Sequence, residues 1–122
     1  MKILLVDDNA NMRSTIASFL HSDDNEIIEL EDGEKAVEQY ENIKPDWVLM
    51  DIKMGKLNGL DATKMIKQKF PDAHIAIVTN YSDNVYRICA EKVGADAFVS
   101  KQNLYQLKNI IGRQAASSKW KV

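Results

Sequence analysis

The sequence predicts an α/β fold in which a mostly parallel five-stranded sheet is doubly wound, with helices on both faces. Five short apolar runs alternate along the chain with five longer stretches whose apolar residues recur every three or four positions. This strict alternation is typical of repeated strand-helix units. The first, third and fourth runs are nearly continuous in apolar residues, as expected for central strands that are buried on both faces. A chain of 122 residues is long enough for one domain with a core, so a single domain over residues 1–122 is expected.

The strands are expected where the apolar runs lie. The second run alternates polar and apolar residues more than the others, which suits a strand at the edge of the sheet. The five expected strands are Lys2–Val6, Glu26–Leu30, Asp46–Met50, His74–Thr79 and Asp96–Ser100.

The helices are expected between these runs, and three of them have recognisable ends. The second ends at Lys44 and the third before Phe70, because Pro45 and Pro71 follow and the residue before a proline avoids the helical region. Gly94 is the expected C-cap of the fourth helix. The repeating apolar positions are Met12, Ile16, Phe19 and Leu20 in the first helix, Ala36, Val37, Tyr40 and Ile43 in the second, Leu60, Met65 and Ile66 in the third, Val85, Ile88, Cys89 and Val93 in the fourth, and Leu104, Leu107, Ile110 and Ile111 in the fifth.

Composition and charge are those of an ordinary soluble protein, with 45% hydrophobic residues, 28% charged residues and a formal net charge of -2. Nothing in this balance indicates binding to nucleic acid or to a membrane surface. Cys89 is the only cysteine, so no internal disulfide is expected. No apolar stretch approaches the ~20 residues that span a bilayer, and the N-terminal run is shorter than the about 7–15 residues of a secretory signal. A cytoplasmic location is therefore expected, with Trp47 in the core, and with residues 117–122, including Trp120, as a frayed tail or the start of a linker.

Five polar residues follow the apolar runs and indicate the chemistry of the chain. Asp7 and Asp8 follow the first run, Asp51 the third and Thr79 the fourth, and Lys101 comes shortly after the fifth. Parallel strands bring their carboxyl ends to one edge of the sheet, where ligands of open α/β folds bind. Three carboxylates, a hydroxyl and an ammonium are therefore expected to converge there.

Crowded carboxylates resist ionisation unless a cation shares their site. Mg²⁺ prefers one or two carboxylates together with water and phosphate oxygens, so it fits a crevice that holds Asp7, Asp8 and Asp51. A carboxylate can also attack phosphorus, and the single, central Asp51 is the better nucleophile of the three. Lys101 and Thr79 would neutralise and hydrogen-bond the transferred phosphoryl group.

Each of these residues also has an ordinary structural interpretation. Asp7 and Asp8 could simply open the first helix, Asp51 could be a turn residue, Thr79 a strand residue and Lys101 a solvated surface lysine. These interpretations do not explain why all five lie at the same edge of the sheet. His21 and His74 are isolated in the sequence, so no histidine metal site is expected.

The chain resembles a known family over nearly its whole length. The matching segments are Ile3–Asp8, Pro45–Asp51, Met54 with Asn58-Gly59, Ile77–Thr79, and Gly94–Phe98 leading into Lys101. They resemble the receiver domain of two-component response regulators, the CheY-like superfamily. This resemblance implies a flavodoxin-like (βα)5 fold with strand order 2-1-3-4-5.

The resemblance also implies roles at the site. Asp51 would be the phosphoacceptor for a phosphohistidine donor. Asp8 would be a direct ligand of Mg²⁺ (or Mn²⁺), Asp7 would act through water, and Asp51 and the backbone carbonyl of Lys53 would complete the metal site. The protein would not be a conventional enzyme, but it would catalyse its own phosphorylation and dephosphorylation.

The same resemblance implies a switch. Thr79 would be the switch hydroxyl, Phe98 the switch aromatic and Lys101 the phosphate-binding lysine, and they would relay phosphorylation to the face of the fourth helix, fifth strand and fifth helix. Lys53 and Tyr81, each two residues past a site residue, are expected to obstruct the attacking water and slow self-hydrolysis. Exposed candidates on the relay face are Arg87, Glu91, Lys92, Gln106 and Asn109.

Three positions depart from the family pattern. Gly55 and Gln102 stand where many members have proline, and Asn80 stands where a small residue is usual. These departures predict a more mobile loop at Gly55 and a less fixed geometry around Lys101.

A sensor histidine kinase or a histidine phosphotransfer protein is the expected partner, with an unknown downstream target and no nucleic-acid binding by this domain. The main alternative is a pseudo-receiver that docks proteins without phosphorylation. An aspartyl-nucleophile phosphatase would instead need Asp-x-Asp after the first strand. A flavin carrier would need a phosphate-binding loop there, and Asp7 and Asp8 would repel its phosphate.

Overall fold

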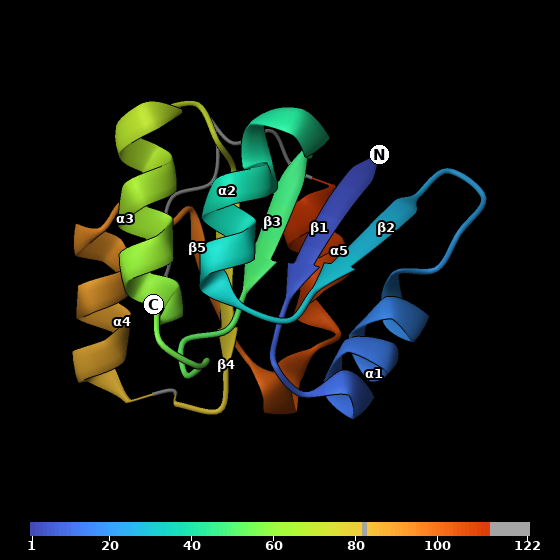
Figure 1. Ribbon diagram of the computed structural model, residues 1–122. Helices are drawn as coiled ribbons and strands as arrows, with labels where there is room; N and C mark the ends of the chain where they lie inside the picture. Colours follow the sequence, from blue (N-terminus) through green and yellow to red (C-terminus); the bar gives the residue numbers. More distant parts are fainter. Residues whose placement is uncertain (82, 113–122) are drawn as a thin grey trace.

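The computed structural model describes residues 1–81 and 83–112, and it confirms the expected fold class. All five strands form one parallel sheet in the order β2-β1-β3-β4-β5 (Figure 1). The strands are β1 Lys2–Val6, β2 Glu26–Leu30, β3 Trp47–Met50, β4 Ile75–Thr79 and β5 Ala97–Ser100. The helices are α1 Ala10–Leu20, α2 Gly33–Ile43, α3 Gly59–Lys69, α4 Asn84–Lys92 and α5 Gln106–Ile111, with a short 3-10 helix, η1, at Lys101–Asn103.

Helices cover both faces of the sheet because alternate strand residues point to opposite sides. In β1, Leu4 and Val6 belong to the apolar cluster beneath α2, α3 and α4, whereas Ile3 and Leu5 belong to the cluster beneath α1 and α5. Trp47 lies in the second cluster, as predicted. The strand β2 lies at an edge of the sheet, also as predicted.

Three strands begin one residue later than predicted, and two of the displaced residues are aspartates that continue the hydrogen-bond pattern in another way. The amide of Asp46 donates to Lys2 O (2.7 Å), and its carboxylate accepts from Lys2 N (2.7 Å). Asp96 repeats this arrangement with Ile75, at 2.7 and 2.8 Å. A side-chain oxygen therefore stands where a strand would supply a backbone carbonyl. The third displaced residue, His74, stacks on Trp47 with 5.4 Å between ring centroids.

The helix ends lie where the sequence signals place them. Gly94 has φ +94°, and the amides of Gly94 and Ala95 donate to Glu91 O and Ala90 O, the two bonds of a Schellman motif. Phe70 leaves the helical region before Pro71, as predicted. Lys44 ends α2 as predicted, and its φ of +50° lies in the left-handed region. The fifth helix is shorter than its apolar repeat: α5 starts at Gln106, although Leu104 is buried with the residues that follow.

Some apolar positions of the helical repeats do not face the core. Phe19, Met65, Val85 and Ile88 are all exposed. None of the helices in the described residues is long and apolar enough to cross a membrane. The predictions for residues 117–122 and Trp120 lie outside the described residues.

Candidate functional site

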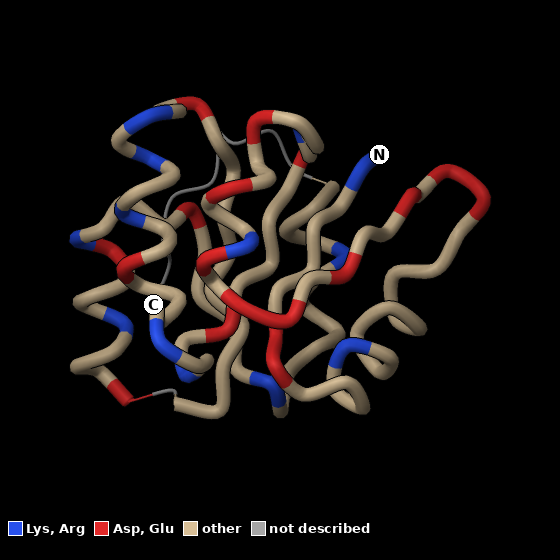
Figure 2. The backbone as a smooth tube through the Cα atoms, in the orientation of Figure 1, with Lys and Arg blue, Asp and Glu red and all other residues tan. Residues whose placement is uncertain are grey.

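The carboxyl ends of β1 and β3 bring Asp7 and Asp51 together. These strands are neighbours in the sheet, with Val6 paired to Met50, so the next residue of each strand emerges at the same edge. Their amides continue the ladder, since Asp7 N donates to Leu30 O (3.1 Å) and Asp51 N donates to Val6 O (3.0 Å). Figure 2 shows acidic segments following both strands at the lower edge of the molecule, with basic segments close by.

Lys101 connects the two aspartates from the opposite end of the sequence. Its Nζ lies 2.8 Å from Asp7 Oδ2 and 3.1 Å from Asp51 Oδ2. The three side chains are only 7%, 2% and 7% exposed, so the ammonium and both carboxylates are shielded from water. The interpretation of Lys101 as a solvated surface lysine is therefore wrong.

The protonation of this cluster reflects its burial. Burial raises the pKa of the Asp51 carboxyl above its ordinary value, and the Asp7 carboxylate adds to this effect while Lys101 opposes it. Burial disfavours the charged form of Lys101, but the two facing carboxylates outweigh that cost and raise the pKa of the ammonium. Lys101 is consequently held as a cation between two acids.

The acidic residues also fit a hard divalent cation. Asp7, Asp8 and Asp51 each offer a carboxylate oxygen, and these oxygens lie within 4.8 Å of one another. Asp7 Oδ2 is buried, and within the described residues its close polar contact is the Lys101 ammonium, at 2.8 Å. Asp8 is exposed and can be reached from solvent. An all-oxygen set of carboxylates suits Mg²⁺.

The start of α1 shows that the two acids do not cap this helix. The N-cap is Asn9, whose side chain accepts from Met12 N at 3.0 Å. Asp7 Oδ1 accepts from the amide of Asn9 (2.9 Å), and Arg13 donates to the backbone carbonyl of Asp7 (2.6 Å). Arg13 therefore helps to fix the backbone of Asp7, a role that sequence reasoning did not identify.

Gly59 lies directly against the backbone of Asp51. A Cβ at position 59 would be 1.7 Å from the carbonyl oxygen of Asp51, so only glycine fits there. The amide of Gly59 donates to Ile52 O (2.8 Å), and Asn58 caps α3 by accepting from Asp61 N. The Asn58-Gly59 pair was a signal in the sequence, but its packing against Asp51 appears only in three dimensions.

Thr79 and Phe98 lie on the same face of the sheet. Thr79 pairs with Ser100 in the parallel register, and Phe98 precedes Ser100 by one full side-chain period. Both side chains are buried, and the Thr79 hydroxyl accepts from Tyr81 N at 3.1 Å. The Arg87 guanidinium lies 4.9 Å from the centroid of the Phe98 ring. Arg87 is therefore partly buried rather than exposed as predicted, whereas Glu91, Lys92, Gln106 and Asn109 are exposed.

Lys53 and Tyr81, each two residues beyond a residue of the site, lie close to each other. The Lys53 Nζ lies 5.2 Å from the Tyr81 ring centroid and 5.7 Å from that of Tyr86. The two tyrosine rings are 5.4 Å apart. Tyr86, on α4, is a further member of this group that the sequence did not single out.

The positions that depart from the family pattern have structural explanations. Gly55 has φ +34°, which proline cannot adopt. The amide of Gln102 donates to Ser100 Oγ (3.2 Å), a bond that a proline at 102 would lack. Asn80 is exposed.

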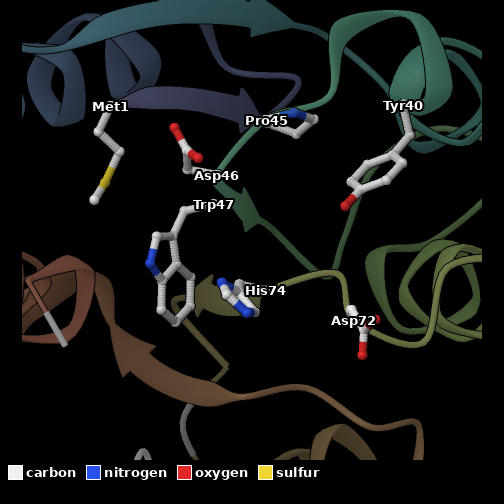
Figure 3. A pocket seen from close by; sticks show the side chains of 7 residues that line it. All are labelled: Met1, Tyr40, Pro45, Asp46, Trp47, Asp72 and His74. Atoms are coloured by element: carbon white, nitrogen blue, oxygen red, sulfur yellow. The ribbon is translucent and has the colours of Figure 1, made fainter. Parts of the chain in front are cut away.

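A shallow pocket lies at the other end of the sheet and does not include the acidic cluster. It is lined by Met1, Tyr40, Pro45, Asp46, Trp47, Asp72 and His74 (Figure 3). These residues surround the starts of β3 and β4, whereas Asp51 and Thr79 lie at their ends. Among the described residues, the group of carboxylates close enough together to hold a metal ion is that of Asp7, Asp8 and Asp51.

Comparison with protein families identifies one match across most of the chain. A family described as the response regulator receiver domain matches residues 3–112. The uncharacterized transcriptional regulatory protein YhcZ of Bacillus subtilis is 39% identical over 103 residues, which cover 83% of this chain and 48% of YhcZ. The chemotaxis protein CheY of Thermotoga maritima is 38% identical over 101 residues, covering 82% of this chain and 84% of CheY. The chain spans about half the length of YhcZ, of DegU from Brevibacillus brevis and of VraR from Staphylococcus saprophyticus.

Solved structures share the fold. The response regulator domain of Thermotoga maritima CheB superposes with a TM-score of 0.85 at 28% identity, covering 98% of both chains. The response regulator TrrA of Thermotoga maritima, solved in complex with Mg²⁺-BeF, superposes with a TM-score of 0.81 at 34% identity, covering 90% of this chain and 95% of TrrA.

Proposed function

The chain belongs to the response regulator receiver domain family, and from that premise we propose that it is a phosphorylation-activated signalling switch whose phosphoacceptor is Asp51. The observation that carries the proposal is the buried cluster in which Lys101 contacts both Asp7 and Asp51. Such a cluster is costly for stability, because two acids and an ammonium are removed from water. A role of the three groups in binding and transferring a phosphoryl group would explain why the chain keeps this costly cluster.

The proposed transfer moves a phosphoryl group from a phosphohistidine to Asp51. An Asp51 carboxylate oxygen attacks phosphorus, the phosphorus-nitrogen bond breaks, and the departing imidazole keeps the bonding electron pair and takes up a proton. Asp51 Oδ1 already accepts from Ile52 N (2.8 Å), which orients the carboxylate, while Oδ2 faces Lys101. Lys101 then pairs with the transferred group and offsets its added negative charge.

A Mg²⁺ or Mn²⁺ ion would be held by Asp7, Asp8, Asp51 and the backbone carbonyl of Lys53. When bound, the ion supplies a second positive centre for the phosphoryl oxygens. The carboxylates of Asp7 and Asp8 come from the end of β1 and its following loop, so they are positioned before any ion arrives.

The proposed signal passes through Thr79 and Phe98 to the face formed by α4, β5 and α5. Thr79 would turn its hydroxyl from Tyr81 N to the phosphoryl group, because hydrogen bonds to charged groups are stronger than those to neutral ones. Phe98 lies on the same side of the sheet and would fill the space that Thr79 leaves. Arg87, stacked on the Phe98 ring, would shift with it and change the surface of α4.

The proposed switch resets by hydrolysis. Water attacks phosphorus, the phosphorus-oxygen bond to Asp51 breaks, and inorganic phosphate leaves with the Asp51 carboxylate restored. Lys53 and Tyr81, in contact at 5.2 Å, would obstruct the incoming water and lengthen the phosphorylated state. The expected phosphodonor is a histidine kinase or histidine phosphotransfer protein. Two of the longer relatives are transcriptional regulatory proteins.

The test is intact-mass analysis after exposure to a small-molecule phosphodonor. The native chain should gain one phosphoryl group only when Mg²⁺ is present, and Asp51→Asn should gain none. Glu91→Gln, a change to an exposed acid on α4 outside the cluster, is the matched control and should behave like the native chain. A native chain that gains no mass would instead support the pseudo-receiver alternative.

A further inference from the structure

We propose that Tyr86 of α4 is a positioning residue that holds the Lys53 side chain over the phosphorylation site and so lengthens the lifetime of the aspartyl phosphate. The inference rests on the proposed function and extends it. It assigns a role to a residue outside the loops that carry Asp51 and Thr79, and it makes that lifetime depend on where α4 lies.

Lys53 needs a contact with another side chain to be held in one position. It lies between Ile52 and Met54, which are both buried, so its own side chain emerges into solvent. A lysine side chain has several rotatable bonds, and an exposed one samples many positions unless a contact selects among them. Among the described residues, the Lys53 ammonium contacts the rings of Tyr81 and Tyr86.

Of the two rings, Tyr86 is the better anchored. Tyr81 is 45% exposed and lies in the loop after β4. Tyr86 lies in the first turn of α4 and is half-buried against the apolar cluster beneath α2, α3 and α4. Its ring also packs on Tyr81, with centroids 5.4 Å apart. Tyr86 therefore ties Lys53 and Tyr81 to the core.

The contact also makes the lifetime sensitive to α4. The N-cap of this helix, Asp83, makes no side-chain capping hydrogen bond, so the first turn is held mainly by packing. Any displacement of that turn moves the Tyr86 ring relative to Lys53. Because linkage is reciprocal, a partner that shifts α4 would alter the exposure of the aspartyl phosphate to water.

The test compares the hydrolysis rates of phosphorylated variants. Tyr86→Leu should speed loss of phosphate about two- to fivefold, the size expected for one exposed cation-π contact. Tyr86→Phe keeps the ring and should retain the native rate. Tyr105→Leu, a change to an exposed tyrosine after η1, should also leave the rate unchanged.

A double-mutant comparison separates positioning from general loosening. In a Lys53→Ala background, Tyr86→Leu should change the rate by less than about twofold, because the side chain that it positions is gone. A full two- to fivefold effect in that background, or a native rate in Tyr86→Leu, would overturn the inference.

An NMR measurement on the unphosphorylated protein keeps this inference distinguishable from the proposed function. Ring currents should displace the Lys53 side-chain proton signals, and Tyr86→Leu should move them toward free-lysine positions while Tyr86→Phe should not. Unchanged Lys53 signals in Tyr86→Leu would refute the contact even if phosphorylation proceeds. A native chain that never acquires phosphate would remove the proposed function, and this inference with it, whatever the Lys53 signals show.

Discussion

At the scale of single residues, the site depends on how closely two backbones approach. The carbonyl of Asp51 lies where a side chain at position 59 would begin, so α3 can start only with a glycine against Asp51. This close approach brings Gly59 N to Ile52 O and sets the direction in which the chain leaves β3. The orientation of the Asp51 carboxylate is therefore determined partly by a residue that has no side chain.

Gly59→Ala tests this dependence. The added methyl group overlaps the Asp51 carbonyl, and overpacking of this kind typically costs about 1–3 kcal/mol of stability. We expect a loss at the upper end of that range in urea unfolding, together with weaker Mg²⁺ binding. Gly112→Ala is the control, since a Cβ there would be 3.3 Å from its nearest neighbour at a φ of -73°. Equal losses in the two variants would contradict the account of Gly59.

At the scale of the elements, α3 places a polar side chain in its contact with the sheet. The helix α3 packs on the sheet through Ala62, Thr63 and Ile66, all fully or almost fully buried. The Thr63 hydroxyl is buried, and within residues 1–81 and 83–112 it has no hydrogen-bond partner. An unsatisfied buried polar group costs about 1–3 kcal/mol, so α3 is held less tightly than its apolar content suggests.

Thr63→Val replaces that hydroxyl with a methyl group of similar size. We expect the free energy of unfolding to rise by about 1 kcal/mol, because the unpaired group is removed and no contact is lost. Chemical denaturation at neutral pH measures the change. Thr15→Val is a useful comparison, since the hydroxyl of Thr15 is exposed and donates to Asn11 O, and its loss should bring no gain. A less stable Thr63→Val protein would show that the hydroxyl has a partner, such as a bound water molecule.

At the scale of the whole molecule, the acidic site couples the two central strands. Asp7 and Asp8 follow β1, and Asp51 follows β3. An ion can therefore bind all three carboxylates only when the two strands are paired in the folded sheet. Ligands that bind the folded state alone stabilise it by mass action. The metal site is therefore expected to contribute to global stability as well as to chemistry.

Mg²⁺ should raise the free energy of unfolding of the whole chain. At a concentration about 100 times its Kd, the gain should be about 2.7 kcal/mol. Urea unfolding with and without Mg²⁺ measures it. Asp8→Asn should lose most of the gain, whereas Asp24→Asn, a change to an acid far from the cluster, should keep it. The same Mg²⁺ effect in Asp8→Asn and the native chain would argue against this site.

Thr79→Ala should separate phosphorylation from the global response. Asp51 would still accept the phosphoryl group, but one charge-assisted hydrogen bond of about 1.5–3 kcal/mol would be missing from the switch. That loss is a large share of the ~5.5 kcal/mol needed to reverse a 1:99 equilibrium. NMR signals of α4, β5 and α5 should therefore shift less on phosphorylation than in the native chain. Full-sized shifts would show that the signal does not pass through Thr79.

Local sequence patterns were enough to predict the order of strands and helices along the chain and to place Asp7, Asp51 and Thr79 at one edge of the sheet. Those features follow from local patterns, because side-chain period and chain breakers act over a few residues. Two strands were predicted to start one residue too early, at Asp46 and Asp96. The side chains of these two residues make hydrogen bonds that resemble those of a strand.

The contacts between distant side chains became known from the three-dimensional packing. Lys101 joins Asp7 across nearly the whole chain, Gly59 fits against Asp51, and Tyr86 meets Lys53. Each contact depends on the distance between the two elements that carry the contacting residues. Periodicity tells which face a residue occupies, but the separation between two faces depends on how every side chain between them fits.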